Sequence, residues 1–447
     1  MSKFIDREGE LALLNERYRS GEAELIFIYG RRRVGKTRLV KEFLKGKRGV
    51  YLLAKQTSVK ENLVSFSKRI SEALGDKLLS LSPLQSWDAL FQYMSRDERI
   101  VFVIDEFPYL VEIDPSLPSV LQYHWDEHLS SSKVLLILTG STISLMEELM
   151  GPKSPLYGRR TGQIKVKPMD YFQARLFFPR YGVKEAVGAY SILGGTPAYL
   201  NLFKDSVSLR ENLARNLRAD SLLYSDAMFL LREEVREPHN YMAVLEAVAL
   251  GYNRFGQIAD VTGLERSSLG KYLSVLQELG LLERLTPIGS RRRGIYRIRD
   301  PYLRFWFRFI HPNQDLVEYG EVERLVDLIC EGLDQYVGEV FEDVVVQLLM
   351  RMNSLGELPF RFSSIGKWWH GDKEFDLVAL GKGKALIVEV KWSDLGEGEV
   401  ERILGRLRER VKGTPFQDRE LHFLVVGRRA PKPAISFEDW DVRLSGL

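Results

Sequence analysis

The stretch that decides the fold is Glu24-Leu-Ile-Phe-Ile-Tyr-Gly-Arg-Arg-Arg-Val-Gly-Lys-Thr37. Residues 24–29 predict a buried strand, and residues 38–44 continue with the periodicity of a helix. The loop between them, Gly30 to Thr37, has the spacing G-x-x-x-x-G-K-[ST]. Strand, loop and helix therefore follow one another in the order that wraps backbone N–H groups around phosphates.

Each part of this loop has an expected role in binding a nucleoside triphosphate. Glycines allow the backbone to curl round the phosphates, Lys36 is expected to reach the outer phosphates, and Thr37 is expected to bind Mg²⁺. The residues predicted to contact the nucleotide are Gly30, Arg31, Arg32, Arg33, Val34, Gly35, Lys36, Thr37 and Arg38.

Two further apolar segments end in polar residues. Residues 100–104 lead into Asp105 and Glu106, and an acid at the end of a buried strand is costly unless a charged group lies beside it. We expect Asp105 to hold Mg²⁺ and Glu106 to polarise the attacking water. Residues 134–138 lead into Thr139-Gly-Ser141, whose hydroxyls either sense the outer phosphate or cap the next helix.

This order of motifs resembles the archaeal ATPase family, which is related to the AAA-type and signal-transducing (STAND) ATPases. The resemblance rests on Phe4-Ile-Asp-Arg7 with Glu10, the Gly30 loop, Asp105-Glu-Phe-Pro108, Gly140-Ser141, Tyr157-Gly-Arg-Arg160 and Gly194-Gly-Thr-Pro197. It implies an α/β P-loop ATPase over residues 1–225, with a central parallel sheet and a helical lid.

The resemblance also implies roles for residues outside the loop. Phe4 and Arg7 are expected near the adenine, and Arg159 or Arg160 is a candidate arginine finger, in cis or from a neighbouring subunit. The alternative for these two arginines is a surface ion pair. The turn at 194–197 is expected to transmit the nucleotide state, or else to be a simple loop between helices.

The composition limits the possible classes. The chain has 447 residues, so two to four domains are expected. With 64 basic and 61 acidic residues the net charge is +3, so a surface that binds a polyanion must be local. Cys330 is the only cysteine, which excludes an intrachain disulfide and favours a reducing compartment. Because no apolar run reaches about 18 residues, we expect a soluble cytoplasmic protein without a membrane partner.

Residues 226–312 predict a winged helix. Helices over 241–250, 255–261 and 265–276, with a glycine turn before the third, are typical of a helix-turn-helix. The side chains expected to contact DNA are Arg266, Ser267, Ser268 and Lys271 in a groove, and Arg291, Arg292 and Arg293 at the tip of the following hairpin. The alternative is that this domain packs on the ATPase core as a lid and never touches DNA.

Residues 325–447 carry a second set of chemical groups. Asp376 begins one strand, and Glu389 and Lys391 lie two residues apart on the next, so they point to one face. A hairpin between the strands places Asp376 beside them. Two carboxylates and a lysine on one face would bind Mg²⁺ or Mn²⁺ and orient a water for phosphodiester attack.

This pattern resembles the PD-(D/E)xK nuclease superfamily, in the form fused to archaeal ATPases, and implies an α/β restriction-endonuclease-like domain. Glu342, on the preceding helix, is a fourth candidate metal ligand. The sequence departs from the motif at Phe375, which stands where a proline is expected. The alternative is a charged pair on the exposed face of an edge strand.

Together these features predict an ATP-hydrolysing, DNA-directed protein whose nucleotide state gates a metal-dependent nuclease. ATP, Mg²⁺ and DNA are the expected ligands, and a homo-oligomer is an open possibility. Two alternatives remain at this stage. One is an ATP-driven conformational switch whose C-terminal domain binds but does not cut nucleic acid. The other is an oligomeric remodelling ATPase whose partner is another protein.

Overall fold

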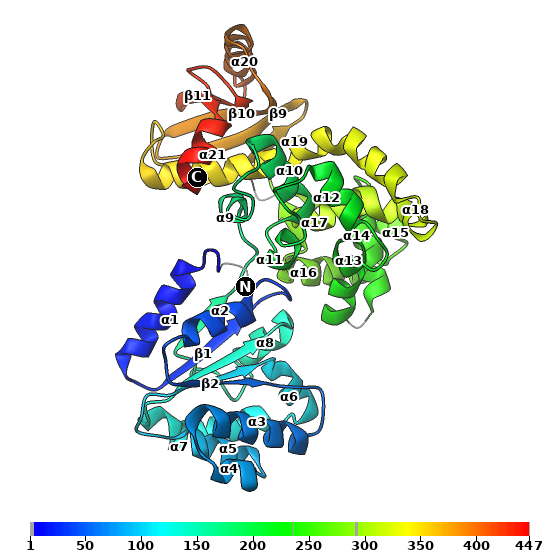
Figure 1. Cartoon of the computed structure of the whole chain (residues 1–447). Coiled ribbons are helices and arrows are strands. Elements are labelled where there is room, and N and C mark those ends of the chain that lie inside the picture. The colour runs from blue at the N-terminus through cyan, green and yellow to red at the C-terminus, as the bar shows by residue number, and fades with distance from the viewer. Residues whose placement is uncertain (1–3, 236, 291–293, 447) are drawn as a thin grey trace. The chain divides into compact units, whose positions relative to one another are not determined.

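The chain forms two compact units, Met1–Pro168 and Met169–Leu447 (Figure 1). Its structure, a computed structural model, describes residues 4–235, 237–290 and 294–446. Each unit has a sheet of its own, and the two are described separately below. Within the described residues, no helix combines the length and apolar character needed to cross a membrane.

The first unit is built on a five-stranded parallel sheet of order β2-β3-β4-β1-β5. Its strands are β1 (Glu24–Tyr29), β2 (Gly49–Leu53), β3 (Val101–Asp105), β4 (Leu135–Gly140) and β5 (Gly162–Lys165). The three central strands are buried along their whole length, as continuous apolar runs in parallel sheets are. This confirms the predicted α/β class with a central parallel sheet.

Helices connect and cover these strands. They are α1 (Glu8–Ser20), α2 (Lys36–Leu44), α3 (Val59–Leu74), α4 (Leu78–Leu81), α5 (Trp87–Met94), α6 (Phe107–Ile113), α7 (Leu117–Glu127), the 3₁₀ turn η1 (Leu129–Ser131) and α8 (Ile143–Leu149). Apolar side chains of α1 and α2, such as Leu14 and Leu39, pack with Ile26 and Val103 of the sheet in one buried cluster. Because all five strands run parallel, their carboxyl ends meet at one edge, where the polar motifs begin.

The second unit begins with helices and a hairpin. Its elements up to the long helix are α9 (Tyr171–Arg175), α10 (Val183–Leu193), α11 (Pro197–Leu200), α12 (Leu209–Asn216), α13 (Leu222–Glu234), α14 (Pro238–Ala249), α15 (Phe255–Thr262), α16 (Arg266–Glu278), β6 (Leu282–Leu285), β7 (Ile295–Ile298), α17 (Pro301–Phe305), η2 (Trp306–Ile310), η3 (His311–Asn313), α18 (Gln314–Glu318) and α19 (Val322–Leu355). Helices α14 to α16 and the antiparallel β6–β7 pair follow in the order predicted for a helix-turn-helix with a hairpin.

The C-terminal part of this unit is a separate mixed sheet of order β12-β11-β10-β9-β8. Its elements are β8 (Ser364–His370), β9 (Lys373–Leu380), β10 (Lys384–Asp394), α20 (Glu397–Arg410), β11 (Glu420–Arg429), β12 (Ile435–Ser436) and α21 (Phe437–Ser445). Strand β10 is antiparallel to β9 and parallel to β11. Val378 of β9 and Ile387 of β10 pack with Leu407 and Val411 on the side of α20, so α20 covers this face of the sheet.

Residues 169–225, which the sequence predicts to be part of the ATPase domain, lie in the second compact unit. A buried ion pair contributes to this attachment, because Arg175 Nε lies 3.0 Å from the Asp441 carboxylate on α21. Tyr171 donates to the same carboxylate at 2.8 Å. Burial, followed by the charge of Asp441, raises the pKa of this tyrosine.

Candidate functional sites

The loop after β1 has the backbone of a phosphate-binding cradle. Gly30 has φ 152° and Gly35 has φ 100°, and Arg33 also lies at positive φ. A Cβ at Gly30 would lie 2.3 Å from the carbonyl oxygen of Val166, so only glycine fits there. Helix α2 starts directly after the loop, at Lys36, and its amino end carries the partial positive charge that favours an anion.

Lys36 is buried and holds the cradle together. Its ammonium group donates to the carbonyl oxygens of Gly30 and Arg31, at 2.8 and 3.1 Å, and to the hydroxyl of Ser141, at 2.9 Å. These are neutral acceptors in a buried site. A phosphate oxygen at the mouth of the loop is a stronger acceptor for this ammonium group, because hydrogen bonds between charged partners are about twice as strong.

Asp105 is almost fully buried at the end of β3 and accepts three hydroxyl hydrogen bonds. Thr37 donates to its Oδ2 at 2.9 Å, while Tyr51 donates to Oδ2 and Thr139 to Oδ1. Thr37 and Asp105 therefore meet, as the sequence predicts for a Mg²⁺ site. Two oxygen ligands of this kind, beside a phosphate cradle, fit the hard and hydrated Mg²⁺ ion.

Tyr51 on β2 was not singled out by the sequence reasoning. Burial, followed by the hydrogen bond to Asp105 and its negative charge, raises the pKa of Tyr51 well above its ordinary value. The available signal was the short apolar run Gly49-Val-Tyr-Leu-Leu53, which becomes a strand of alternately half-buried and buried residues up to its exposed end. It could show that Tyr51 is half-buried, but not that it points at an acid on the neighbouring strand.

Glu106 has an unusual backbone conformation, with φ 56° and ψ 45° in the left-handed region. For a residue other than glycine this costs about 1 kcal/mol or more, and such strain is concentrated at functional sites. Its carboxylate accepts from the backbone N–H of Ser141 at 3.0 Å and from the Ser141 hydroxyl. Since Lys36 donates to the same hydroxyl, Ser141 links the lysine to the glutamate.

Other residues predicted to lie at the nucleotide site contact neighbouring parts of the first unit. Arg7 is buried and donates to the carbonyl oxygens of Val34 and Lys167, at 3.3 and 2.7 Å, so it braces the loop against the end of β5. Phe4 packs against the core cluster of this unit. Arg32 donates to the hydroxyl of Tyr109 at 2.6 Å.

The two candidate finger arginines also have partners. Arg159 forms a two-pronged pair with Asp126, at 2.8 and 2.6 Å, which is the surface ion pair that the sequence left as the alternative. Arg160 donates to the carbonyl oxygen of Met150 at 3.2 Å. Both side chains therefore have hydrogen-bond partners within the first unit.

In the second unit the predicted acids do converge. The register that pairs Val388 with Leu377 puts Asp376 opposite Glu389 when it is continued by one position. Both share the face of Val378 and Ile387, which is the face that α20 covers. Burial, followed by the negative charge of Glu389, raises the pKa of Asp376 to about 6.

Cations surround these two carboxylates. Lys391 donates to Glu389 Oε1 at 2.8 Å, and Arg410 of α20 lies 3.7 Å from Glu389 Oε2. The backbone N–H of Val390 donates to Asp376 at 2.8 Å. Glu342 adds to the negative charge at Asp376 but forms a close ion pair with Lys367 on β8. Across the described residues, no three His, Cys, Asp or Glu side chains are arranged to hold a metal ion.

The predicted DNA contacts on α16 are exposed, and they are Arg266, Ser267, Ser268 and Lys271. The predicted hairpin-tip arginines, Arg291, Arg292 and Arg293, lie outside the described residues. The loop that follows β6 is docked, because the N–H of Ile288 donates to the carbonyl oxygen of Lys367 at 2.9 Å. The Ile288 side chain joins the apolar cluster of the C-terminal sheet.

A partly buried charge network reinforces this docking. Asp343 of α19 accepts from Arg297 on β7 at 2.8 Å and from Arg304 on α17 at 2.6 Å. Burial disfavours the charged carboxylate, but these two guanidinium groups outweigh it and lower the pKa of Asp343 to about 2. The hairpin is therefore fixed to the long helix that carries Glu342.

A parallel sheet with a glycine-rich phosphate cradle, a lysine, and an acid at the end of the adjacent strand defines the class of P-loop ATPases. Residues 4–203 match a family described as an ATPase domain predominantly from Archaea. Residues 306–403 match a family described as Archaea bacterial proteins of unknown function.

One relative is similar to this protein over nearly the whole chain. Over 433 residues, 95% of this chain and 96% of the relative, the sequence is 37% identical to the protein MJECL04 of Methanocaldococcus jannaschii. The chain therefore belongs to the same family as this relative, and its residues 4–203 match the ATPase domain found predominantly in Archaea. An ATP-binding protein of the same organism, MJ0423, is 49% identical over 45 residues, 10% of this chain and 76% of its own length.

A solved structure is similar in fold. The Walker-type ATPase PABY2304 of Pyrococcus abyssi has 22% sequence identity and a TM-score of 0.51. The match covers 68% of this chain and 96% of that one.

Proposed function

We propose that this protein hydrolyses ATP and uses its nucleotide state to control DNA cleavage by its C-terminal part. The observation that carries the proposal is the placement of Asp376 opposite Glu389 on one sheet face, with Lys391 two residues further along β10. Carboxylates in this arrangement repel each other unless a cation lies between them. Burial, and after it the charge of Glu389, raises the pKa of Asp376.

In the first unit, the proposed chemistry follows from the contacts at the cradle. Lys36 exchanges its contacts with Gly30, Arg31 and Ser141 for the outer phosphates. Thr37 and Asp105 hold Mg²⁺, which neutralises charge on the phosphates. Glu106 orients and polarises the attacking water.

In the C-terminal sheet, Asp376 and Glu389 would hold Mg²⁺ or Mn²⁺. Glu389 Oε2 is buried and accepts no hydrogen bond from the described residues, so one of its lone pairs is available to a metal ion. To serve as a metal ligand, Glu389 would have to give up its ion pair with Lys391. Lys391 then lies on the same face, next to the water that attacks the phosphodiester.

A cleavage assay on duplex, single-stranded and branched DNA, with Mg²⁺ or Mn²⁺ and with or without ATP, tests the proposal. Asp376→Ala and Lys391→Ala should each eliminate cleavage while ATP turnover persists. Lys36→Ala should remove ATP turnover and the effect of ATP on cleavage. Cleavage that survives both C-terminal substitutions would refute the proposed nuclease site.

A C-terminal part that binds DNA without cutting it is the second candidate. It is favoured by the ion pairs that occupy the carboxylates, Glu389 with Lys391 and Glu342 with Lys367. In that case the wild-type protein binds DNA with a steep dependence on salt, but no metal ion supports cleavage.

A further inference from the structure

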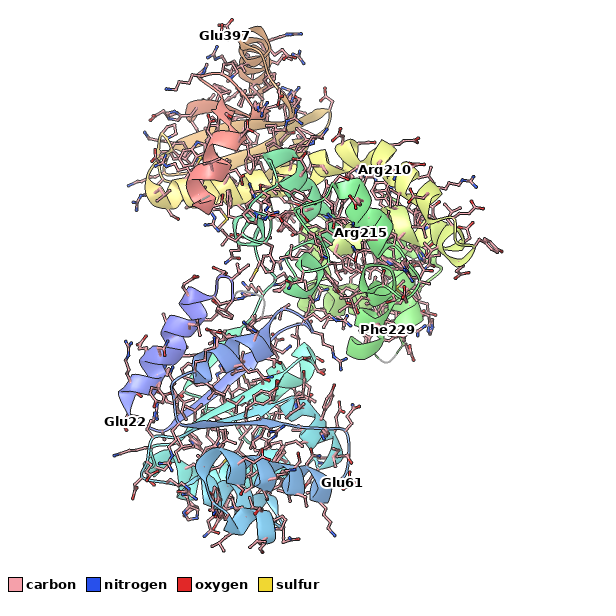
Figure 2. All side chains as sticks on the ribbon, viewed as in Figure 1. Glu22, Glu61, Arg210, Arg215, Phe229 and Glu397 are labelled. Carbon is pink, nitrogen blue, oxygen red and sulfur yellow. The ribbon has the colours of Figure 1, made fainter. Side chains whose placement is uncertain are left out.

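The helix α20 carries a row of arginines that the proposed function leaves without a role. Arg402, Arg406 and Arg410 are spaced by four residues, so they lie along one flank of the helix. Figure 2 labels Glu397 at the start of α20 and shows the side chains of this helix projecting around it. Because the net charge of the chain is only +3, such a local row is where a polyanion would bind.

The row ends at the proposed nuclease site. Arg410 lies 3.7 Å from Glu389 Oε2, and it also donates to the backbone carbonyl oxygen of Glu374 on β9 at 3.2 Å. Lys391 contacts the other oxygen of Glu389. The line of cations therefore continues from α20 onto the sheet face that holds Asp376.

The outer two arginines are available to a ligand. Arg402 and Arg406 are exposed, and neither forms an ion pair within the described residues. The acids closest to them along this flank are engaged elsewhere. Glu399 accepts from the backbone N–H of Gly396 at 3.1 Å, and Glu409 is held by Lys412 at 2.6 Å.

The spacing of the row suits a phosphodiester backbone. A rise of about 1.5 Å per residue separates successive arginines by about 6 Å, so the row spans about 12 Å. One DNA strand carries a charge every 3.4 Å or so along the duplex axis, which places three to four phosphates over that length. A mononucleotide or a single phosphate would use only one end of the row.

We infer that the row formed by Arg402, Arg406 and Arg410 binds the phosphate backbone of one DNA strand and leads it to Asp376 and Glu389. This inference rests on the proposed nuclease function and names the surface by which that site holds a polynucleotide. Arg410 is the residue at which the bound strand meets the metal site, and Arg402 binds the strand furthest from it.

The test measures binding of labelled duplex DNA to the full chain in EDTA, by fluorescence anisotropy over a range of salt concentrations. The double variant Arg402→Ala, Arg406→Ala should reduce the slope of log affinity against log salt by about 2, because each lost phosphate contact removes about 0.9. At 0.1 M salt each phosphate contact then contributes about eightfold to the DNA affinity, so the affinity of the double variant should fall about sixtyfold.

A matched double variant, Arg218→Ala with Arg324→Ala, removes two exposed and ion-paired arginines of the same unit. It should leave both the slope and the affinity unchanged. An unchanged slope in the α20 variant, or an equal fall in the control variant, would overturn the inference. A wild-type protein that binds RNA duplexes more tightly than DNA through the same arginines would overturn DNA as the partner.

Cleavage separates this inference from the proposed function. If the wild-type protein cuts DNA and the α20 double variant cuts it equally well, the arginine row is refuted while the nuclease site stands. If the wild-type protein binds through the row but never cuts, the proposed nuclease fails while the row stands as a DNA-binding surface. Charge reversal by Arg402→Glu with Arg406→Glu should abolish binding, and an intact thermal transition shows that the variant is folded.

Discussion

Replacing Asp376 by asparagine removes a carboxyl group of the C-terminal site whose pKa is raised. Asp376 is partly buried, and Glu389 lies opposite it on the neighbouring strand. Burial and this second negative charge raise the pKa of Asp376 to about 6, from an ordinary value of 3.8. Asparagine has the same shape, carries no charge, and keeps an oxygen that accepts from the backbone N–H of Val390.

The magnitude follows from the difference between the two pKa values. A difference of about two pH units, at 1.36 kcal/mol for each, corresponds to about 3 kcal/mol. The folded pKa is higher than the unfolded one. The metal-free protein therefore has the full contribution below about pH 4 and loses it as the pH rises through about 6. Above that pH, Asp376→Asn should be more stable than the wild type by up to about 3 kcal/mol.

Hydrogen exchange of β9 and β10 amides in the full chain, followed by mass spectrometry in EDTA, measures this local stability. Wild-type protection should fall between about pH 4 and pH 7, after correction for intrinsic exchange, while that of Asp376→Asn stays level. Asp394→Asn is a control on the same strand, since a hydrogen bond from Arg428 lowers the pKa of Asp394. Parallel pH profiles for wild type and Asp376→Asn would refute the shared carboxylate face.

Three further outcomes are expected. Lys36→Ala should abolish ATP hydrolysis. Glu106→Gln should bind ATP normally but fail to release phosphate. If Glu106→Gln releases phosphate at the wild-type rate, Glu106 is not the base. Tyr51→Phe should raise severalfold the Mg²⁺ concentration needed for half-maximal ATP turnover, because Asp105 loses one of its hydroxyl donors. An unchanged Mg²⁺ titration would contradict this role of Tyr51. Asp343→Ala should destabilise the second unit by about 1–3 kcal/mol, seen as a lower melting temperature, because the partly buried Arg304 loses its carboxylate partner while Arg297 keeps Glu283.

The elements that could be predicted from the sequence are those determined by the pattern of residues within one segment. The strand at 24–29, the loop and helix α2 form one continuous segment, so spacing alone determines where Lys36 and Thr37 lie. The Asp376–Glu389 pair is also local, because a short turn joins β9 to β10 and fixes their register. In both cases the contacts join residues fewer than about 20 positions apart, within the reach of periodicity arguments.

The residues that were missed lie at the ends of long-range contacts. Tyr51 reaches Asp105 across 54 positions, and Ile288 is 79 positions from Lys367 in the sequence printed above. The pair of Arg175 and Asp441 spans 266 positions. Nothing in the periodicity of any one segment encodes such a partner, because each side chain has several neighbouring strands or helices to pack against.

The long helix α19 explains how the hairpin and the proposed nuclease site are connected. Glu342 and Asp343 are consecutive, so their side chains leave the helix about 100° apart and serve different neighbours. Asp343 holds the hairpin strand β7 through Arg297, while Glu342 pairs with Lys367, whose carbonyl oxygen accepts from Ile288 in the loop that follows β6. The hairpin therefore contacts both members of the Glu342–Lys367 pair or their neighbours, because Arg297 binds Asp343 beside Glu342 and Ile288 binds Lys367. Because Glu342 contributes to the negative charge at Asp376, helix α19 joins the hairpin to the proposed nuclease site.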